Sequence, residues 1–150
     1  MAPAARVSQS HSMREGDHTV SELSAQQIKA FRQRLEEHSS QLREEIRQEL
    51  LKYDDEQYLE LAGKVHDSEE ESVADLLVDL NLADIDRHVQ EMRAVESALL
   101  RIDTGRYGVC SECNSPIAVE RLQVQPAALR CLGCQALYEQ RFAQPGHPSL

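Results

Sequence analysis

Four cysteines in two close pairs constrain this chain more than any other feature of its sequence. Cys110 pairs with Cys113 and Cys131 with Cys134, which gives the spacing Cys-x2-Cys-x17-Cys-x2-Cys, and the chain has no other cysteine. A two-residue spacer lets one tight turn aim two sulfur atoms at a common point, and two such turns can surround one ion. The spacing therefore predicts a tetrahedral zinc site.

Four protein ligands leave no open coordination position, so we expect one structural Zn²⁺ that folds a segment too short to hold a core by itself. Asn114 follows the first pair and Gly133 lies inside the second. Both residue types tolerate the left-handed backbone that such turns often need. Iron in a four-thiolate site stays open as the chemical alternative, because geometry alone does not separate the two metals.

Two other interpretations of the cysteines fit less well. Two disulfide bonds suit a secreted protein, yet residues 1–20 contain no apolar run of the length that a signal peptide needs. A thioredoxin-like Cys-x-x-Cys would accompany a strand–helix–strand pattern, which we do not find. No later run approaches a membrane span, so we expect a soluble, cytoplasmic protein without membrane contact.

Two stripes of apolar residues precede the cysteines, at steps that are mostly three, four or seven. The first stripe comprises Ile28, Phe31, Leu35, Leu42, Ile46, Leu50, Tyr53 and Tyr58. The second comprises Val73, Leu77, Leu80, Ile85, Met92, Val95, Leu99 and Ile102. Neither stripe contains proline or glycine, which favours two long helices.

A short interruption at Gly63 and the polar residues 66–72 separates the stripes, so the helices should fold back on each other as an antiparallel hairpin. Each helix would be about 45 to 55 Å long at 1.5 Å per residue. His38 and His88 fall on the stripes and are expected to pack at the seam. The predicted fold class is mainly α: a long antiparallel coiled-coil hairpin, a small C-terminal four-cysteine zinc finger module and a short terminal helix.

The chain therefore divides into four predicted parts: 1–21 as a flexible N-terminal tail, 22–104 as the coiled-coil hairpin with an acidic tip near 63–75, 105–143 as the zinc finger with the C-terminal helix, and 144–150 as a tail. Ser21 or Ser24 would cap the first helix. Tyr138 and Phe142 would lie on the terminal helix and pack against the zinc module.

The negative charge is concentrated in one segment. The net charge is −10, and residues 54–86 carry −11 because they hold twelve acidic residues and one basic residue, Lys64. Direct binding to DNA needs the opposite sign and is not expected. An acidic segment suits a basic groove on a partner or a metal ion, although a charge run by itself is usually a solvated surface.

Four short motifs surround the cysteines: Gly105-Arg-Tyr-Gly-Val-Cys110, Pro116-Ile, Arg121-Leu and Pro126-Ala. Together they resemble the C4-type zinc finger of the DksA/TraR family, and the long hairpin is similar to that of its DksA-like members. The resemblance covers about Ala25 to Phe142. It implies a transcription regulator that binds RNA polymerase and inserts the hairpin tip into the secondary channel, in many members together with ppGpp, the alarmone of the stringent response.

The family carries an Asp-x-x-Asp-x-Ala motif at the tip, near the magnesium ion of the polymerase. Counting back from Cys110 places Asp67, Glu70 and Ser72 at this motif. The resemblance therefore implies that these three residues contact the partner. Glu70 is longer by one methylene than the family's aspartate, and Ser72 adds a hydroxyl. The resemblance therefore implies entry into the channel more directly than it implies the regulatory outcome.

The residues that would hold ppGpp depart further from the family. Its cations correspond to Ala94, Gln125 and Gln135 here, and an apolar neighbour corresponds to Glu91. Phosphate binding needs cationic or backbone donors. We therefore expect a strongly weakened ppGpp contact and weak or no ppGpp dependence. Zinc is the one expected cofactor, and the protein is expected to be a monomer.

Two other functions stay open. A transcript-cleavage factor on the same channel would use acidic hairpin residues to position a second magnesium ion, and Asp67 with Glu70 has the chemistry for this. A zinc-stapled stress adaptor would instead bind a different protein through its coil. An enzyme is not expected, because the sequence offers no convincing nucleophile–base pair and commits its cysteines to metal.

Overall fold

The structure is a computed structural model that describes residues 22–53, 55–67, 71–77 and 83–142. These residues form six helices: α1 (Ala25–Leu51), α2 (Glu56–Asp67), α3 (Val73–Leu76), α4 (Ala83–Asp103), α5 (Val119–Val124) and α6 (Leu132–Phe142). The predicted tails at 1–21 and 144–150 lie outside the described residues, as does Glu70. In the part of the chain that is described, no helix combines the length and the apolar character that a membrane span requires.

Helix α1 begins at one of the two predicted caps. The Ser24 side chain accepts a hydrogen bond from the Gln27 N–H at 3.1 Å, and the Gln27 side chain accepts one from the Ser24 N–H at 2.8 Å. This capping box satisfies two N–H groups that a helix start leaves without partners. The predicted stripe is the buried face of α1, through Phe31, Leu35, Leu42, Ile46 and Leu50.

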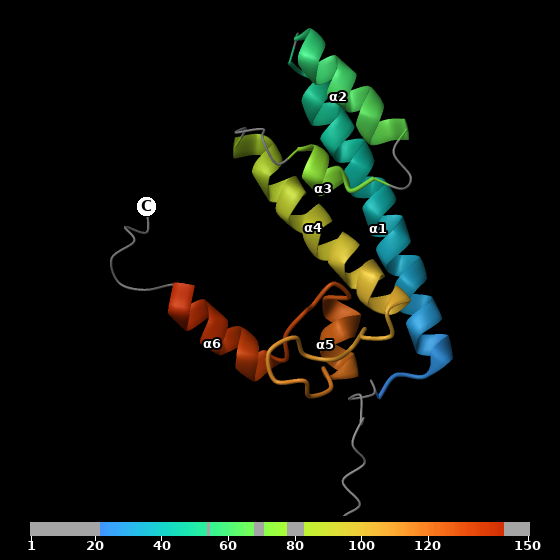
Figure 1. Ribbon diagram of the computed structural model, residues 1–150, viewed down its shortest axis with the longest axis vertical. Coiled ribbons are helices and arrows are strands. Elements are labelled where there is room, and N and C mark those ends of the chain that lie inside the picture. Colours follow the sequence, from blue (N-terminus) through green and yellow to red (C-terminus); the bar gives the residue numbers. More distant parts are fainter. Residues whose placement is uncertain (1–21, 54, 68–70, 78–82, 143–150) are drawn as a thin grey trace, which may run out of the picture.

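Helix α4 packs antiparallel to α1, which confirms the mainly α hairpin architecture (Figure 1). Arg32 near the start of α1 lies 2.7 Å from Asp103 at the end of α4, and Glu45 lies 3.2 Å from His88. The described residues of α4 that face the core are Ile85, Val89, Met92, Val95 and Ala98. His38 also lies at this seam, 3.8 Å from the Glu91 carboxylate.

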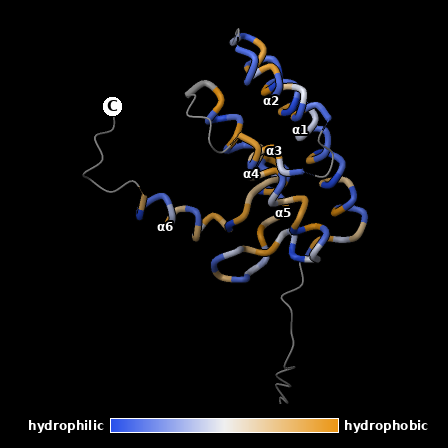
Figure 2. Tube along the Cα trace, turned by 45° about the horizontal axis from the view of Figure 1, so that its top comes forward, coloured by the Kyte–Doolittle hydropathy of each residue, from blue (hydrophilic) through white to orange (hydrophobic). Residues whose placement is uncertain are grey.

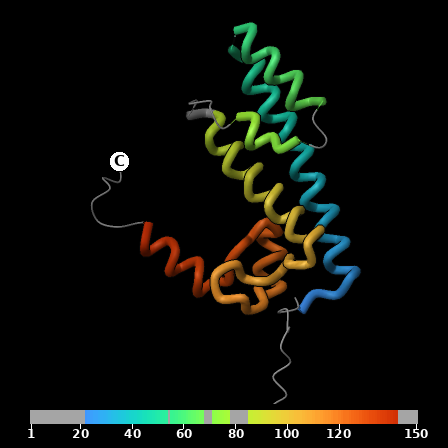
Figure 3. Tube along the Cα trace, in the orientation of Figure 1, coloured from blue at the N-terminus to red at the C-terminus, as the bar shows by residue number. Residues whose placement is uncertain are grey.

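The chain turns earlier than the stripe predicted. Helix α1 ends at Leu51, and α2 runs back beside it, so the far end of the arm formed by α1 to α4 is the turn around residues 52–55 (Figure 3). The described residues of the predicted tip at 63–75 do not lie at this end. Ala62 and Val65 on α2 are buried inside the arm instead.

The cause of this early turn is local. The Asp55 carboxylate accepts a hydrogen bond from the Gln57 N–H at 2.8 Å, as a residue at a helix start does. The stripe itself takes a step of five from Tyr53 to Tyr58, which no single helical face accommodates. In the structure these two rings pack across the turn, with centroids 5.1 Å apart.

The second predicted helix is divided as well. The short helix α3 packs against α4 and buries Val73, Ala74 and Leu77, and α4 begins only at Ala83. Ser72 caps α3 by accepting a hydrogen bond from the Asp75 N–H at 3.1 Å. Ser72 therefore starts the second helical stretch where the polar interruption at 66–72 predicts it, and the predicted continuous helix is divided after Leu76.

Gly105 ends α4 and starts the base of the molecule. Its φ of 72° is left-handed, and the next N–H, of Arg106, bonds back to the Arg101 carbonyl at 2.7 Å. Helix α5 packs beneath the arm, whereas α6 projects from the base (Figure 1). Figure 2 shows that hydrophobic residues recur along α4 and around α5, where the arm and the base meet.

Candidate functional site

The first cysteine pair lies in a tight turn that the backbone closes. The Cys110 N–H donates to the Ser115 carbonyl at 2.8 Å, and the Asn114 N–H donates to the Cys110 carbonyl at 3.0 Å. Asn114 has a φ of 59°, so the predicted left-handed residue is confirmed here. The turn buries Cys110 and leaves Cys113 exposed.

The second pair lies at the start of a helix. Cys131 directly precedes α6 and Cys134 lies in its first turn, where the Cys134 N–H donates to the Cys131 sulfur at 3.5 Å. Gly133 is a residue of α6 and is absent from the left-handed residues of the described chain, so its predicted role is wrong. The helix start supplies the turn instead, and its N–H groups favour thiolates.

The two turns bring all four sulfur atoms within 4.8 Å of one another. Cys113 Sγ lies 3.9 Å from Cys131 Sγ. A tetrahedral zinc ion with Zn–S bonds of about 2.3 Å would place its ligands about 3.8 Å apart. The cysteines form no disulfide with one another. The donor set and its spacing therefore fit one structural zinc ion.

The four thiols differ in how readily they ionise. Burial raises the pKa of Cys110, but N–H groups of Cys113, Cys131 and Glu112 more than offset it and lower this pKa to about 6. The pKa of Cys113 is lowered by hydrogen bonding to Ser115. Hydrogen bonds that the Cys134 thiol donates to the sulfur atoms of Cys131 and Cys113 raise its pKa to about 12. These directions describe the thiols alone, and a bound zinc ion would hold all four as thiolates.

The zinc module is joined to the arm through Tyr107. Its ring packs on Phe31 of α1 with centroids 5.8 Å apart, and its hydroxyl donates to the Pro126 carbonyl at 2.7 Å. Burial raises the pKa of Tyr107 to about 12. Arg101 of α4 donates to the Val109 carbonyl next to the first cysteine, and burial lowers its pKa. A zinc ion held by the four cysteines would therefore fix the foot of the arm through these contacts.

Helix α6 is held at its start and exposed elsewhere. Arg130 donates to Glu112 at 3.2 Å, and its guanidinium carbon lies 3.8 Å from the centre of the Tyr138 ring. No described residue of α6 is buried. Phe142 is 66% exposed and contacts the Tyr138 ring, so it does not pack against the zinc module as predicted.

Of the three predicted partner-binding residues, Asp67 and Ser72 lie on the flank of the arm, and Glu70 lies outside the described residues. The Asp67 side chain, at the end of α2, is 83% exposed and lies 3.1 Å from His66. The Ser72 hydroxyl faces inward and donates to Glu96 of α4 at 2.6 Å. Glu96 was not among the predicted site residues, because no motif in the sequence around it indicates a contact with Ser72.

The three positions expected to lack the family's cations line a single cavity of about 830 Å³ between the arm and the base. They are Ala94, Gln125 and Gln135. The cavity also contains three arginines, and each has a partner. Arg34 donates to the Gln123 carbonyl at 3.0 Å, Arg121 donates to the Arg130 carbonyl at 2.9 Å, and Arg130 is paired as described above.

Known proteins share both the base and the arm. Residues 105–140 match the family model of the prokaryotic dksA/traR C4-type zinc finger. The chain is 28% identical over 118 residues to the RNA polymerase-binding transcription factor DksA of Escherichia coli K12, which covers 79% of this chain and 75% of that protein. It is 35% identical over 65 residues to the protein of the same name from Haemophilus influenzae, or 43% of this chain and 45% of that protein. Among solved structures, transcription factor DksA2 from Pseudomonas aeruginosa is similar with a TM-score of 0.53 and 25% identity, over 81% of this chain and 89% of that one.

Proposed function

We propose that this chain, a DksA-like C4 zinc finger protein, binds RNA polymerase and modulates transcription initiation. The observation that carries the proposal is the match of arm and finger together to a relative named for RNA polymerase binding. The zinc ion has a structural role, because four cysteines fill its coordination sphere. The protein acts by contact and not as an enzyme.

The arm is the part proposed to enter the secondary channel of the polymerase. Helix α1 has 27 residues and is therefore about 40 Å long at 1.5 Å per residue. The far end exposes Asp55, Glu56 and Glu60, and the flank exposes Asp67. Exposed carboxylates on a narrow arm suit a channel with basic walls or a bound metal ion.

The predicted contact residues have distinct roles in this proposal. Asp67 and Glu70 supply carboxylates to the polymerase. Ser72 contributes indirectly, because its hydroxyl is engaged inside the arm by Glu96 and by the Asp75 N–H. The monomer would be the active form.

We further propose that ppGpp contributes little. Ala94, Gln125 and Gln135 offer the cavity at the base no cationic group. Its arginines hold the zinc module together through carbonyl groups and Glu112, so binding a phosphate would compete with these bonds. Glu91 adds a carboxylate nearby, paired with Arg87 at 3.3 Å.

The experiment is a binding assay with purified polymerase core, followed by transcription in vitro from a stringently controlled promoter with and without ppGpp. We expect binding, and an effect on initiation that ppGpp changes less than twofold. A lack of binding to the core would refute the proposal and favour an adaptor for another protein. Shortened RNA in backtracked complexes would show transcript cleavage instead.

A further inference from the structure

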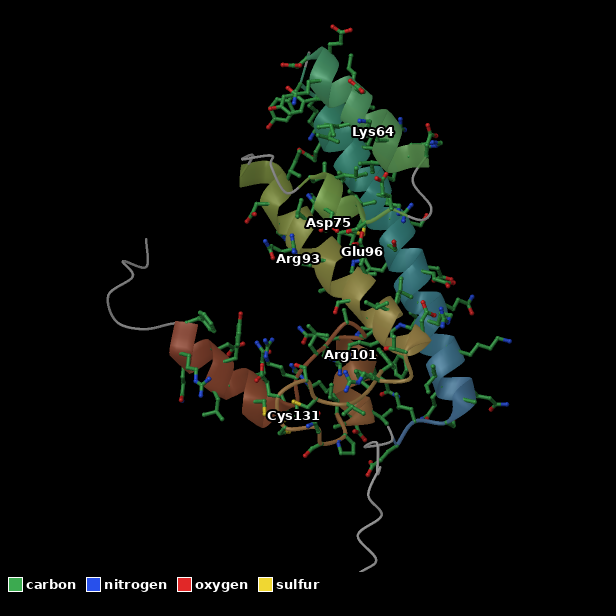
Figure 4. The ribbon with its side chains drawn as sticks, in the orientation of Figure 1. Lys64, Asp75, Arg93, Glu96, Arg101 and Cys131 are labelled. Atoms are coloured by element: carbon green, nitrogen blue, oxygen red, sulfur yellow. The ribbon has the colours of Figure 1, made fainter. Side chains whose placement is uncertain are left out.

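We propose that Ser72 and Glu96 form a latch that fixes the end of the acidic segment, residues 67–72, against the flank of α4; Asp67, Glu71 and Ser72 are the residues of this segment that the structure describes. Glu96 is thereby a positioning residue for the polymerase contact, and this role rests on the function proposed above. Figure 4 labels Glu96 on α4 and Asp75 on α3, both partway along the arm, with Cys131 at the base.

The Glu96 carboxylate accepts three hydrogen bonds from the start of α3. The Ser72 hydroxyl donates to one oxygen at 2.6 Å. The N–H groups of Val73 and Ala74 donate to the other oxygen at 2.9 and 3.4 Å. The Ser72 oxygen also accepts from the Asp75 N–H, so one pair of side chains satisfies three N–H groups of this helix start.

These bonds are stronger than ordinary surface contacts. Each has an ionised acceptor, and the pair is partly buried, where water and salt screen it less than an exposed ion pair. The buried side chains of Val73 and Ala74 adjoin the contact. Hydrogen bonding and apolar burial therefore hold the same point of the chain.

The charge of the acidic segment explains why neutral donors are needed here. Asp67, Glu71 and Asp75 surround Ser72 in sequence, and the group from α4 that contacts Ser72 is a further carboxylate, that of Glu96. Like charges repel, so the attraction must come from the hydroxyl and the N–H groups. An alanine at position 72, as in the family motif, would remove both the cap and the bond to Glu96.

The latch decides where the carboxylates emerge. Because α3 is tied to the middle of α4, the described residues of the segment lie on the flank of the arm, away from its far end, where α2 follows α1. A polymerase groove that receives Asp67 must therefore face the side of the arm. Releasing the latch would leave the charge of the segment unchanged and remove its fixed place.

Amide hydrogen exchange of the zinc-loaded full chain tests the latch without polymerase. In Ser72→Ala and Glu96→Ala we expect residues 73–77 to exchange about tenfold faster or more, because a hydrogen bond to a charged group is lost. Glu96→Gln, which keeps one acceptor oxygen and the side-chain shape, should fall between these variants and the wild type. The double variant should exchange more slowly than two independent effects predict, because the residues are coupled.

Glu91→Gln is the matched control. It makes the same change of charge on the same helix, but Glu91 contacts Arg87 and His38 and not α3. Its residues 73–77 should exchange as in the wild type. Unchanged exchange in both alanine variants, or equal acceleration in the control, would overturn the latch.

Polymerase assays without ppGpp test the positioning role. The latch variants should bind the core with wild-type affinity, but their effect on initiation should be several-fold weaker than that of the wild type. The variant with the fastest amide exchange should show the weakest effect. Glu91→Gln should keep both wild-type binding and the wild-type effect on initiation. Variants that exchange faster yet regulate fully would overturn the positioning role. If the wild type does not bind polymerase, the proposed function fails, and the exchange result still decides whether the latch exists.

Discussion

Replacing Phe31 by alanine should uncouple the zinc module from the arm. The Phe31 side chain is 6% exposed, and its ring packs on Tyr107, which is 3% exposed and belongs to the segment that leads into the first cysteine pair. Phe31→Ala removes this ring from the point where α1, Tyr107 and the Pro126 carbonyl meet. The substitution therefore leaves a cavity beneath the foot of the arm.

The expected cost is large for a protein of this size. Truncating a buried phenylalanine to alanine costs about 3–5 kcal/mol, which includes the loss of the ring pair. Domains are stable by about 5–15 kcal/mol, so the variant would lose about a fifth of its stability or more. Phe142→Ala is the matched control, because Phe142 is 66% exposed on α6. We expect it to cost about 1 kcal/mol or less.

Urea denaturation of both zinc-loaded variants, followed by circular dichroism, measures these costs. A chelator competition assay on the same samples measures zinc release, which should be faster in Phe31→Ala because the module has lost its support. The reasoning is refuted if Phe31→Ala unfolds at the same urea concentration as the wild type. It is also refuted if Phe142→Ala is equally destabilised.

Two further predictions concern the base. Chelating zinc from the reduced protein should unfold residues 105–140, while most of the helical signal of α1 to α4 survives. A protease should then cut within the zinc finger. A finger that stays resistant to the protease would contradict this prediction. Because the pKa of Tyr107 is raised to about 12, the folded state keeps this phenol protonated at pH values above the ordinary tyrosine pKa of about 10. Its contribution to stability is complete below pH of about 10 and is lost as the pH rises through 12. An absorbance titration should show one of the four tyrosines ionising late, and Tyr107→Phe should remove this late step; a late step that persists in the variant would assign it elsewhere.

The parts of the fold that follow from short-range chemistry could be predicted from the sequence. The cysteine spacing gave the zinc site, because two residues between ligands fix a turn whatever surrounds it. Ser24, one of the two predicted caps, follows from the same kind of short-range chemistry, and the structure adds Gln27 as its partner. The turn after Leu51 was missed because it contains neither proline nor glycine. Asp55 makes it, and the step of five in the stripe was its sign.

The contact between Ser72 and Glu96 could not be predicted, because its partners lie 24 residues apart and meet only once α2 has folded back. Ser72 with Asp75 does match the pattern of a helix start, which indicates α3 but says nothing of α4. Gly133 shows the opposite error. A glycine between two ligands suggested a left-handed turn, whereas the start of α6 already provides the required geometry.

Charge reversal in the acidic segment tests the central claim most directly. The variant Asp67→Lys with Glu70→Lys and the control Glu36→Lys, which changes an exposed residue near the foot of α1, would be compared with the wild type for binding to polymerase core and for initiation in vitro. We predict that the double variant loses its effect on initiation while it still binds the core, and that the control keeps both. Wild-type regulation by the double variant would contradict the claim that this segment acts on the polymerase.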